Sequence, residues 1–304
     1  MHTLCTPPSF RLLSAGRDPP ICSIDGAFSL HSTNGRKQKS RQKALLPRLS
    51  DGYRVQNKNA SIVSILTFLY DGGGGNTVLA QLKHAGFNWK DMKEIFVTHK
   101  HVDHIMGIIW MIRMICQYMD HGDYEGEANI YACDEVIEIL RNMSEYLLQK
   151  KETRFIGDRL HLISVKDGEN RLINGREITF FDIHSTKAKQ FGFVMRLPDG
   201  EKFTCCGDEP CAESCYGYAR DSKWLLHEAF CLYSDADILD PYEKHHSTVK
   251  DACELAEMLN VRNLLLYHTE DRRISDRRRL YGEEGRGYYS GNLFIPDDLE
   301  TLLL

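Results

Sequence analysis

Three histidines and an aspartate fall within one short segment, and this cluster constrains the fold more than any other part of the chain. The cluster consists of His99, His101, Asp103 and His104. It follows the apolar residues 94–97, which are typical of a short buried strand. The apolar run that starts at Ile105 predicts a helix. We therefore expect the cluster on a turn between a strand and a helix.

Such a cluster favours a site for divalent metal ions. Neutral imidazole is a preferred ligand of zinc and related metals, and a carboxylate beside it can hold a second ion. Alternate residues of an extended segment point the same way, so His99 and His101 can reach one ion while Asp103 and His104 reach another. The alternative is a solvated polar loop. It is disfavoured because the flanking residues are apolar, and buried imidazoles without a metal would lack partners.

Ligands of the same chemical type close three later strand patterns. Apolar stretches typical of strands end directly before His184, Asp208 and His268. Strands that alternate with helices, with such residues at the strand ends, are typical of layered α/β folds whose cleft opens at one edge. The sequence therefore predicts a two-metal site built from one turn and three strand ends.

The spacing His-x-His-x-Asp-His, followed by a separate His, a Gly-Asp and a His, resembles the metallo-β-lactamase superfamily of binuclear hydrolases. Two segments, 227–229 (His-Glu-Ala) and 246–248 (His-Ser-Thr), are similar to boxes of its ribonuclease Z branch, which processes tRNA 3′ ends. Residues 268–272 resemble the closing box of that branch. The likeness runs from about Ile62 to the end of the chain and implies an α/β fold, the four-layer αββα metallo-β-lactamase sandwich.

The resemblance also implies two divalent metal ions, for which zinc is favoured, and a ligand set. The first ion would take His99, His101 and His184, the second Asp103, His104 and His268, and Asp208 would bridge them. Two cations about 3.5 to 4 Å apart can hold a shared hydroxide, because coordination lowers the pKa of water toward about 7. Asp103 could orient or deprotonate that water. The expected chemistry is hydrolysis.

Three further residues are candidates for catalytic or binding roles. His246 would exchange a proton with the leaving oxygen, and Glu228 would orient it. The alternative for Glu228 is a structural ion pair. The alternative for His246 is a structural position at the start of a helix, directly before Ser247 as the helix N-cap. Arg272 is our candidate for binding a substrate phosphate, because guanidinium presents a fork of donors. The alternative for the arginines that follow it is a solvated helix face.

The chain departs from the ribonuclease Z pattern in three places. Phe230 stands where the first box has Thr, and His245 stands where the second has Gly. The interval between His184 and Asp208 is almost filled by two predicted strands joined by Pro198-Asp199-Gly200, which indicates a hairpin. The interval therefore has no room for the long arm with which full-length ribonuclease Z enzymes grip tRNA.

The first 60 residues differ from the rest. They hold ten Lys and Arg against three Asp and Glu, and the run Arg36 to Lys43 is strongly basic. This run could bind a phosphate backbone, but the composition favours a disordered segment. We therefore expect an atypical basic segment over 1–60 and a hydrolase domain over 61–304.

Composition is that of a globular enzyme, with 42% hydrophobic and 27% charged residues. No apolar run approaches the roughly 18 residues of a membrane span, and the start lacks a secretory signal. We therefore expect a cytoplasmic protein whose ten cysteines are thiols. Four of them surround Asp208, but without a Cys-x-x-Cys pair they are better explained as small core residues than as a zinc site.

The leading hypothesis is a metal-dependent phosphodiesterase similar to ribonuclease Z, acting on RNA or on a smaller phosphodiester. One alternative is a lactone or thioester hydrolase on the same scaffold, which would need an apolar acyl pocket. Another is a metal-binding homologue without activity. The resemblance also implies a homodimer, and nothing in the sequence indicates a membrane partner.

Overall fold

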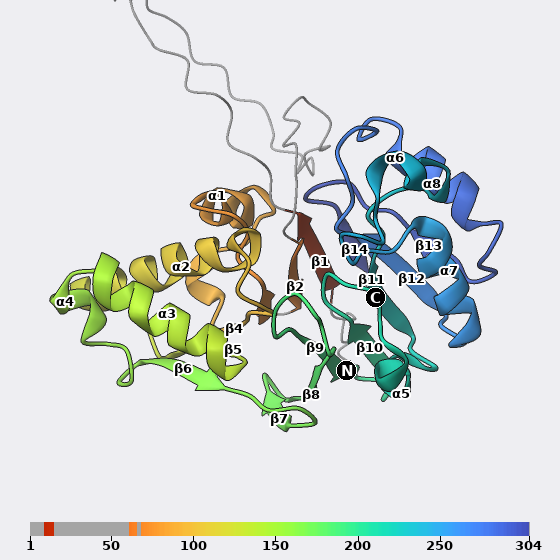
Figure 1. The fold of residues 1–304 in the computed structure, drawn as a ribbon. Coiled ribbons are helices and arrows are strands. Elements are labelled where there is room, and N and C mark those ends of the chain that lie inside the picture. Colours follow the sequence, from red (N-terminus) through yellow and green to blue (C-terminus); the bar gives the residue numbers. More distant parts are fainter. Residues whose placement is uncertain (1–8, 15–60, 66–67, 304) are drawn as a thin grey trace, which may run out of the picture.

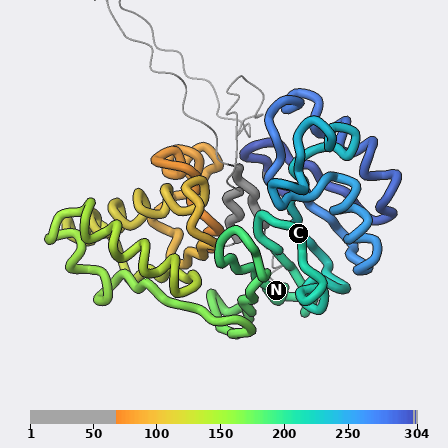
Figure 2. Tube along the Cα trace, viewed as in Figure 1, coloured from red at the N-terminus to blue at the C-terminus, as the bar shows by residue number. Residues whose placement is uncertain are grey.

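The computed structural model describes residues 9–14, 61–65 and 68–303 of the chain. These residues form two seven-stranded sheets, with strand orders β14-β1-β2-β3-β4-β5-β6 and β13-β12-β11-β10-β9-β8-β7. Figure 1 shows helices α1 to α4 beside the first sheet and helices α6 to α8 beside the second, with the strands between the two groups. The tube in Figure 2 shows the same two halves, which follow one another along the chain. The four-layer αββα sandwich is therefore confirmed.

The first half of the described chain supplies most of the first sheet. Its elements are β1 (Ser9–Ser14), β2 (Ser61–Ile65), β3 (Phe68–Tyr70), α1 (Thr77–His84), β4 (Glu94–Phe96), α2 (Val102–His121), β5 (Ala128–Ala132), α3 (Asp134–Leu147), α4 (Lys150–Thr153) and β6 (Leu160–Ser164).

The second half supplies the second sheet and returns one strand to the first. Its elements are β7 (Asn170–Ile173), β8 (Arg176–Asp182), β9 (Phe191–Arg196), β10 (Lys202–Cys205), α5 (Tyr216–Ala219), β11 (Trp224–Glu228), α6 (Ala236–Leu239), α7 (Val249–Met258), β12 (Asn263–Tyr267), α8 (Arg277–Gly285), β13 (Asn292–Phe294) and β14 (Thr301–Leu303).

Aromatic side chains fill the space between the two sheets. Phe193 of β9 lies 5.6 Å from Phe68 of β3 and 5.7 Å from Phe96 of β4, measured between ring centroids. The Tyr70 and Tyr267 hydroxyls, one from each sheet, form a buried hydrogen bond of 3.0 Å. Face-to-face sheets pack through interleaved side chains of this kind. This core fixes how the ends of β4, β10 and β12 sit relative to one another.

Helix α2 begins earlier than the sequence pattern indicated. We expected it from Ile105, but it starts at Val102, with His101 as an extended N-cap residue. Asp103 therefore lies in the first helical turn, where a carboxylate interacts favourably with the helix dipole. In the described part of the chain, α2 and the other helices are too short or too polar to cross a membrane.

Two glycines allow the loop after β3 to lie directly on α2. The Gly107 backbone N–H donates to the Gly73 carbonyl at 2.8 Å, and the Gly72 N–H donates to the His104 carbonyl at 2.9 Å. A Cβ atom at Gly107 would lie 1.7 Å from the Gly72 carbonyl oxygen. Only glycine therefore fits at this point of α2.

The substitution Gly107→Ala is expected to destabilise the fold by about 1 to 3 kcal/mol or more, the usual cost of forcing extra volume into a packed site. Urea unfolding followed by circular dichroism measures this change. Gly217→Ala is the matched control, because a Cβ at that helical glycine meets nothing within 4 Å. Equal midpoints for the two variants would contradict the packing argument.

Several elements differ from the sequence expectations. Near Ile62, where the resemblance begins, the chain forms two strands, β2 and β3, which pair antiparallel with Val63 opposite Tyr70. The sequence pattern did not predict β7, α8 or β13. Residues 9–14, within the segment expected to be disordered, form β1, which pairs antiparallel with β2 and β14. The other residues up to 60, the basic run included, lie outside the described residues, and the domain boundary stays a prediction.

The hairpin before Asp208 is confirmed. Strands β9 and β10 pair antiparallel with Arg196 opposite Lys202. The short link between them closes through a hydrogen bond from the Leu197 N–H to the Glu201 carbonyl. The described residues between His184 and Asp208 therefore contain no long arm.

Candidate metal centre

Six of the seven predicted metal ligands come together at one edge of the two sheets. His99 and His101 lie in the loop after β4, and Asp103 and His104 lie in the first turn of α2. Asp208 follows β10, and His268 follows β12. In two groups of these side chains, one ligand atom from each residue lies within 4.8 Å of those of the others: His99 with His104 and Asp208, and Asp103 with His104 and His268.

Asp208 occupies the centre of this cluster. Its Oδ2 atom lies 3.5 Å from His99 Nε2, 3.6 Å from His104 Nε2 and 3.7 Å from His268 Nε2. His101 joins the cluster through its Nδ1 atom, which lies 2.8 Å from His99 Nε2. One carboxylate oxygen faced by three imidazole nitrogens is the arrangement expected of a residue shared between two cations.

The three distances from Asp208 Oδ2 to the imidazole Nε2 atoms are close to the spacing of ligands around a bound metal ion, whereas the 2.8 Å between His99 and His101 is a hydrogen-bond distance. Ligand atoms about 2.0 to 2.2 Å from a tetrahedral cation lie roughly 3.3 to 3.6 Å apart. In addition, His104 Nε2, His268 Nε2 and Asp208 Oδ1 are buried and have no hydrogen-bond partner in the structure. Buried polar atoms nearly always have partners. The residues present therefore fit a pair of divalent cations.

Asp71 orients two of the histidines from behind. Its Oδ2 atom accepts hydrogen bonds from His104 Nδ1 at 2.7 Å and from the Thr98 hydroxyl at 2.9 Å, and its Oδ1 atom accepts from the Thr98 N–H at 2.8 Å. The Thr98 oxygen in turn lies 2.9 Å from His99 Nδ1. These contacts place the ring protons of both histidines on Nδ1. The Nε2 lone pairs are then on the Asp208 side, where that of His99 accepts a hydrogen bond from His101 Nδ1.

The role of Asp71 was not predicted from the sequence. The available signal was a carboxylate directly after a buried strand, ahead of four glycines. Its contacts with Thr98 and His104 could not be read from that signal, because they depend on how the loop lies on α2.

Burial and neighbouring charges shift the pKa values of the candidate ligand histidines. Burial lowers the pKa of His99 well below its ordinary value and the pKa of His268 to about 4, so both rings are neutral at pH 7. Burial would also lower the pKa of His104, but the carboxylates of Asp71 and Asp208 outweigh it and raise that pKa well above its ordinary value. A proton and a metal ion therefore compete for His104, as is usual for metal-binding histidines.

The structure does not bring the seventh predicted ligand, His184, into the cluster. Its side chain is 56% exposed, and its Nδ1 atom lies 4.0 Å from Asp182. The residue has a positive φ of 58°, and its backbone N–H donates to Asp182 at 2.7 Å. These contacts direct His184 toward its own strand end. Its role as a ligand of the first ion stays a prediction.

The predicted proton-exchanging pair lies beside the cluster. His246 Nδ1 is 3.5 Å from Glu228 Oε2, and Glu228, His246 and His268 have ligand atoms within 4.8 Å of one another. The other Glu228 oxygen, Oε1, accepts hydrogen bonds from the backbone and hydroxyl of Ser247 at 2.5 and 2.6 Å. Glu228 is thus fully buried and held in place, with one oxygen directed at His246.

The alternative that makes Ser247 a helix N-cap is wrong. The N-cap of α7 is Thr248, whose hydroxyl accepts from the Asp251 N–H in a capping box. Because capping needs only a hydroxyl and a nearby carboxylate, either Ser247 or Thr248 fits the sequence pattern. The structure uses Ser247 to hold Glu228 instead.

A cavity of about 450 Å³ opens beside the cluster. It is lined by His101, Asp103, Lys187, Asp208, Phe230, Lys244, His246, His268 and Glu270. Arg272, our candidate for phosphate binding, is not among these residues. It is exposed, and its backbone N–H donates to Glu270. Arg272 therefore does not line the cavity.

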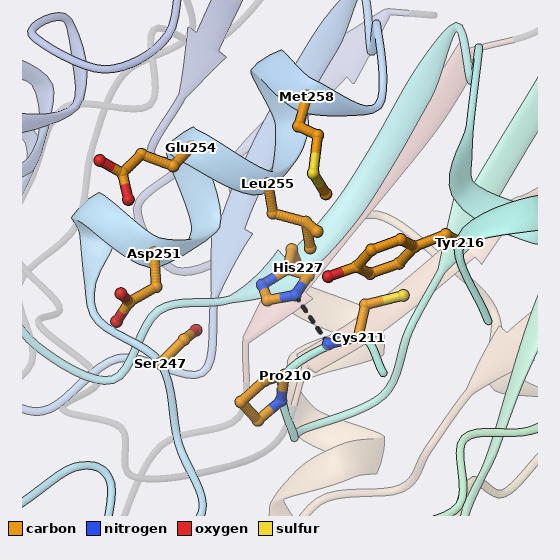
Figure 3. Close-up of a pocket in the computed structure, with 9 residues that line it drawn as sticks. All are labelled: Pro210, Cys211, Tyr216, His227, Ser247, Asp251, Glu254, Leu255 and Met258. Carbon is orange, nitrogen blue, oxygen red and sulfur yellow. Dashed lines mark hydrogen bonds between the residues drawn. The ribbon is translucent and has the colours of Figure 1, made fainter. Parts of the chain in front are cut away.

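A second, smaller pocket of about 290 Å³ is lined by residues of β11 and helix α7, among others (Figure 3). His227 lines it, accepts a hydrogen bond from the Cys211 N–H at 3.1 Å and donates from Nδ1 to the Glu228 carbonyl at 2.7 Å. Both ring nitrogens are therefore occupied away from the metal cluster. The cysteines around Asp208 are buried free thiols.

The fold and the donor set define the chain as a metal-dependent hydrolase of the metallo-β-lactamase fold. Its residues 69–269 match the model of the beta-lactamase superfamily domain. The chain belongs to the beta-lactamase superfamily.

Individual relatives agree with this assignment. Ribonuclease Z of Pyrococcus abyssi is 25% identical over 289 residues, which cover 78% of this chain and 86% of that protein. The solved structure of YhfI from Bacillus subtilis, a metallo-β-lactamase fold protein, aligns with a TM-score of 0.64 and 15% identity over 97% of this chain and 99% of its own. The short form of human tRNase Z aligns with a TM-score of 0.60 and 16% identity, covering 81% and 92% of the two chains.

Proposed function

We propose that the protein is a dinuclear metal-dependent phosphodiesterase similar to ribonuclease Z. The observation that carries this proposal is the position of Asp208 Oδ2, within 3.5 to 3.7 Å of three imidazole nitrogens and next to a cavity that contains His246. Two divalent cations bound there, of which zinc is favoured, would supply a water nucleophile at neutral pH and neutralise charge on the phosphoryl oxygens.

The residues of the chain divide the remaining tasks among them. Asp103, whose side chain is 25% exposed, lines the cavity and orients the attacking water by hydrogen bonding. His246 holds the proton that the leaving oxygen needs, and Glu228 keeps the imidazole in place through Nδ1. Asp71 keeps His104 in the ligand geometry. Each of these roles requires only the contacts described above.

Two lysines favour a phosphodiester over a lactone or thioester. Lys187 and Lys244 both line the cavity, and a neutral acyl substrate gains nothing from two ammonium groups. The short β9–β10 hairpin favours RNA ends or smaller phosphodiesters over substrates gripped at a distance. The cytoplasmic location and the homodimer stay predictions.

The test is hydrolysis by the purified, metal-loaded protein. We expect turnover of bis(4-nitrophenyl) phosphate, complete loss with a chelator and recovery when Zn²⁺ or Mn²⁺ is restored. His246→Ala should lower this turnover by about 10²- to 10⁴-fold, the usual contribution of general acid–base catalysis, while metal content stays unchanged. His161→Ala is the matched control, because His161 lies on β6 and pairs with Glu127.

A pre-tRNA with a 3′ trailer and a lactone complete the substrate panel. Turnover of the pre-tRNA would identify RNA as a substrate. Turnover of the lactone without any phosphodiester hydrolysis would contradict the proposal and favour the acyl hydrolase.

A further inference from the structure

Two loops carry ammonium groups into the cavity beside His246. Lys187 belongs to the loop between β8 and β9, and Lys244 belongs to the loop between α6 and α7. The two loops contact each other through a hydrogen bond of 3.0 Å between Thr186 Oγ1 and His245 Nδ1. The cavity wall on this side is therefore built from two segments that are distant in sequence.

Lys187 lies in the cavity without a close counterion. Its Nζ atom donates to His246 Nε2 at 3.4 Å, and its nearest carboxylate oxygen, Glu209 Oε1, is 3.8 Å away. That oxygen already accepts a hydrogen bond of 2.6 Å from the Ser185 hydroxyl. Both contacts of the ammonium are long for hydrogen bonds, so its charge remains available to a ligand.

Lys244 makes one short hydrogen bond to a backbone carbonyl and keeps its other two N–H donors for a ligand. Its Nζ atom donates to the Leu239 carbonyl at 2.5 Å and lies 5.4 Å from the centre of the Phe230 ring. Among the described residues, no ion pair includes Lys244. By contrast, two other lysines near the site are paired closely: Lys100 with Glu135 at 2.6 Å, and Lys189 with Asp134 at 2.7 Å.

Phe230 fixes the position of the His246 imidazole, which lies between the two lysine ammonium groups and the metal ligands. Its ring stacks on His246 with a centroid distance of 5.2 Å and an interplanar angle of 17°, and His246 lies 5.2 Å from the ring of His268. A substrate phosphate seated against His268 and Asp208 would therefore present oxygens to the lysine side of His246.

We propose that Lys187 and Lys244 bind the non-bridging oxygens of the substrate phosphate, the role that the sequence suggested for Arg272. This inference rests on the proposed phosphodiesterase activity and names the residues that recognise its substrate. When the phosphate enters, the Lys187 N–H turns from His246 Nε2 to a phosphate oxygen. The Nε2 atom, which carries no proton while it accepts from Lys187, is then open to take one from solvent and to give it to the leaving oxygen.

Two variants of Lys187 test the inference. Lys187→Met keeps the apolar stem and removes the charge, and Lys187→Arg keeps the charge. In the metal-loaded protein, Lys187→Met should weaken binding of inorganic phosphate, measured by calorimetry, by about 10- to 100-fold, the range for a lost charge-assisted hydrogen bond. The KM for bis(4-nitrophenyl) phosphate should rise similarly, with kcat changing much less. Lys187→Arg should retain most of the affinity.

The controls separate this inference from the proposed function. Lys189→Met, two residues away and paired with Asp134, should behave as the wild type, and so should Arg272→Ala. Equal phosphate affinity in Lys187→Met and the wild type would overturn the inference. Phosphate binding that depends on Lys187, in a protein that hydrolyses no phosphodiester, would sustain the inference and overturn the proposed function. Melting temperatures confirm that each variant is folded.

Discussion

The substitution Asp208→Asn is expected to remove bound metal and to lower phosphodiester hydrolysis by about 10³-fold or more. Asp208 Oδ2 faces three imidazole nitrogens within 3.7 Å, so its negative charge stabilises any cation that they hold. A neutral amide offers one oxygen and no charge, which makes it a poor ligand shared between two cations. Elemental analysis after dialysis gives the metal content, and initial rates give the activity.

Asp199→Asn is the matched control for this change. Asp199 lies in the link between β9 and β10, is exposed, and pairs with Lys223 at 2.5 Å. It should retain the metal content and activity of the wild type. Full metal occupancy in Asp208→Asn would show that this carboxylate does not hold the cations.

The second large effect is expected at Asp71, which is buried and is not among the residues that line the cavity beside the cluster. In Asp71→Asn the amide NH₂ would meet either the His104 Nδ1–H or the Thr98 N–H, and one donor would lose its acceptor. If the imidazole responds by moving its proton to Nε2, the lone pair that faces Asp208 is lost. We expect metal affinity to fall by about 10- to 100-fold, the usual effect of losing such an orienting carboxylate. Competition with a chromophoric chelator measures it.

Asp134→Asn serves as the control for Asp71→Asn. Asp134 starts helix α3, is 73% exposed, and pairs with Lys189. Its substitution should leave metal affinity unchanged. If Asp71→Asn binds metal as tightly as the wild type, the hydrogen bonds behind His104 do not control the ligand geometry.

The candidate metal ligands could be predicted from the sequence because most of them stand in recognisable local patterns. His99 to His104 are dense in donor types, and Asp208 and His268 each close a clear strand pattern. Parallel strands bring such ends to one edge, so convergence follows from topology. The pairing β10-β11-β12 is parallel, as this reasoning requires.

The remaining residues could not be placed because their positions depend on loop paths. Arg272 was chosen for its chemistry and its closeness to His268 in sequence, yet it is exposed and does not line the cavity. Lys187 was passed over because a lysine three residues after His184 carries no signal of its own. His184 itself has a positive φ. Such a backbone turn changes the direction of the side chain, so the direction cannot be predicted from the alternation of a strand.

The five-residue link between β9 and β10 has a wider consequence for selectivity. With so short a link, the described residues can contact a substrate only around its phosphate. They therefore distinguish substrates by charge and geometry at that point and not by the rest of the molecule. If the proposed activity holds, discrimination among natural compounds would come from the dimensions of this small opening. Such an enzyme would accept chemically diverse esters of phosphate whose departing groups share little beyond their size.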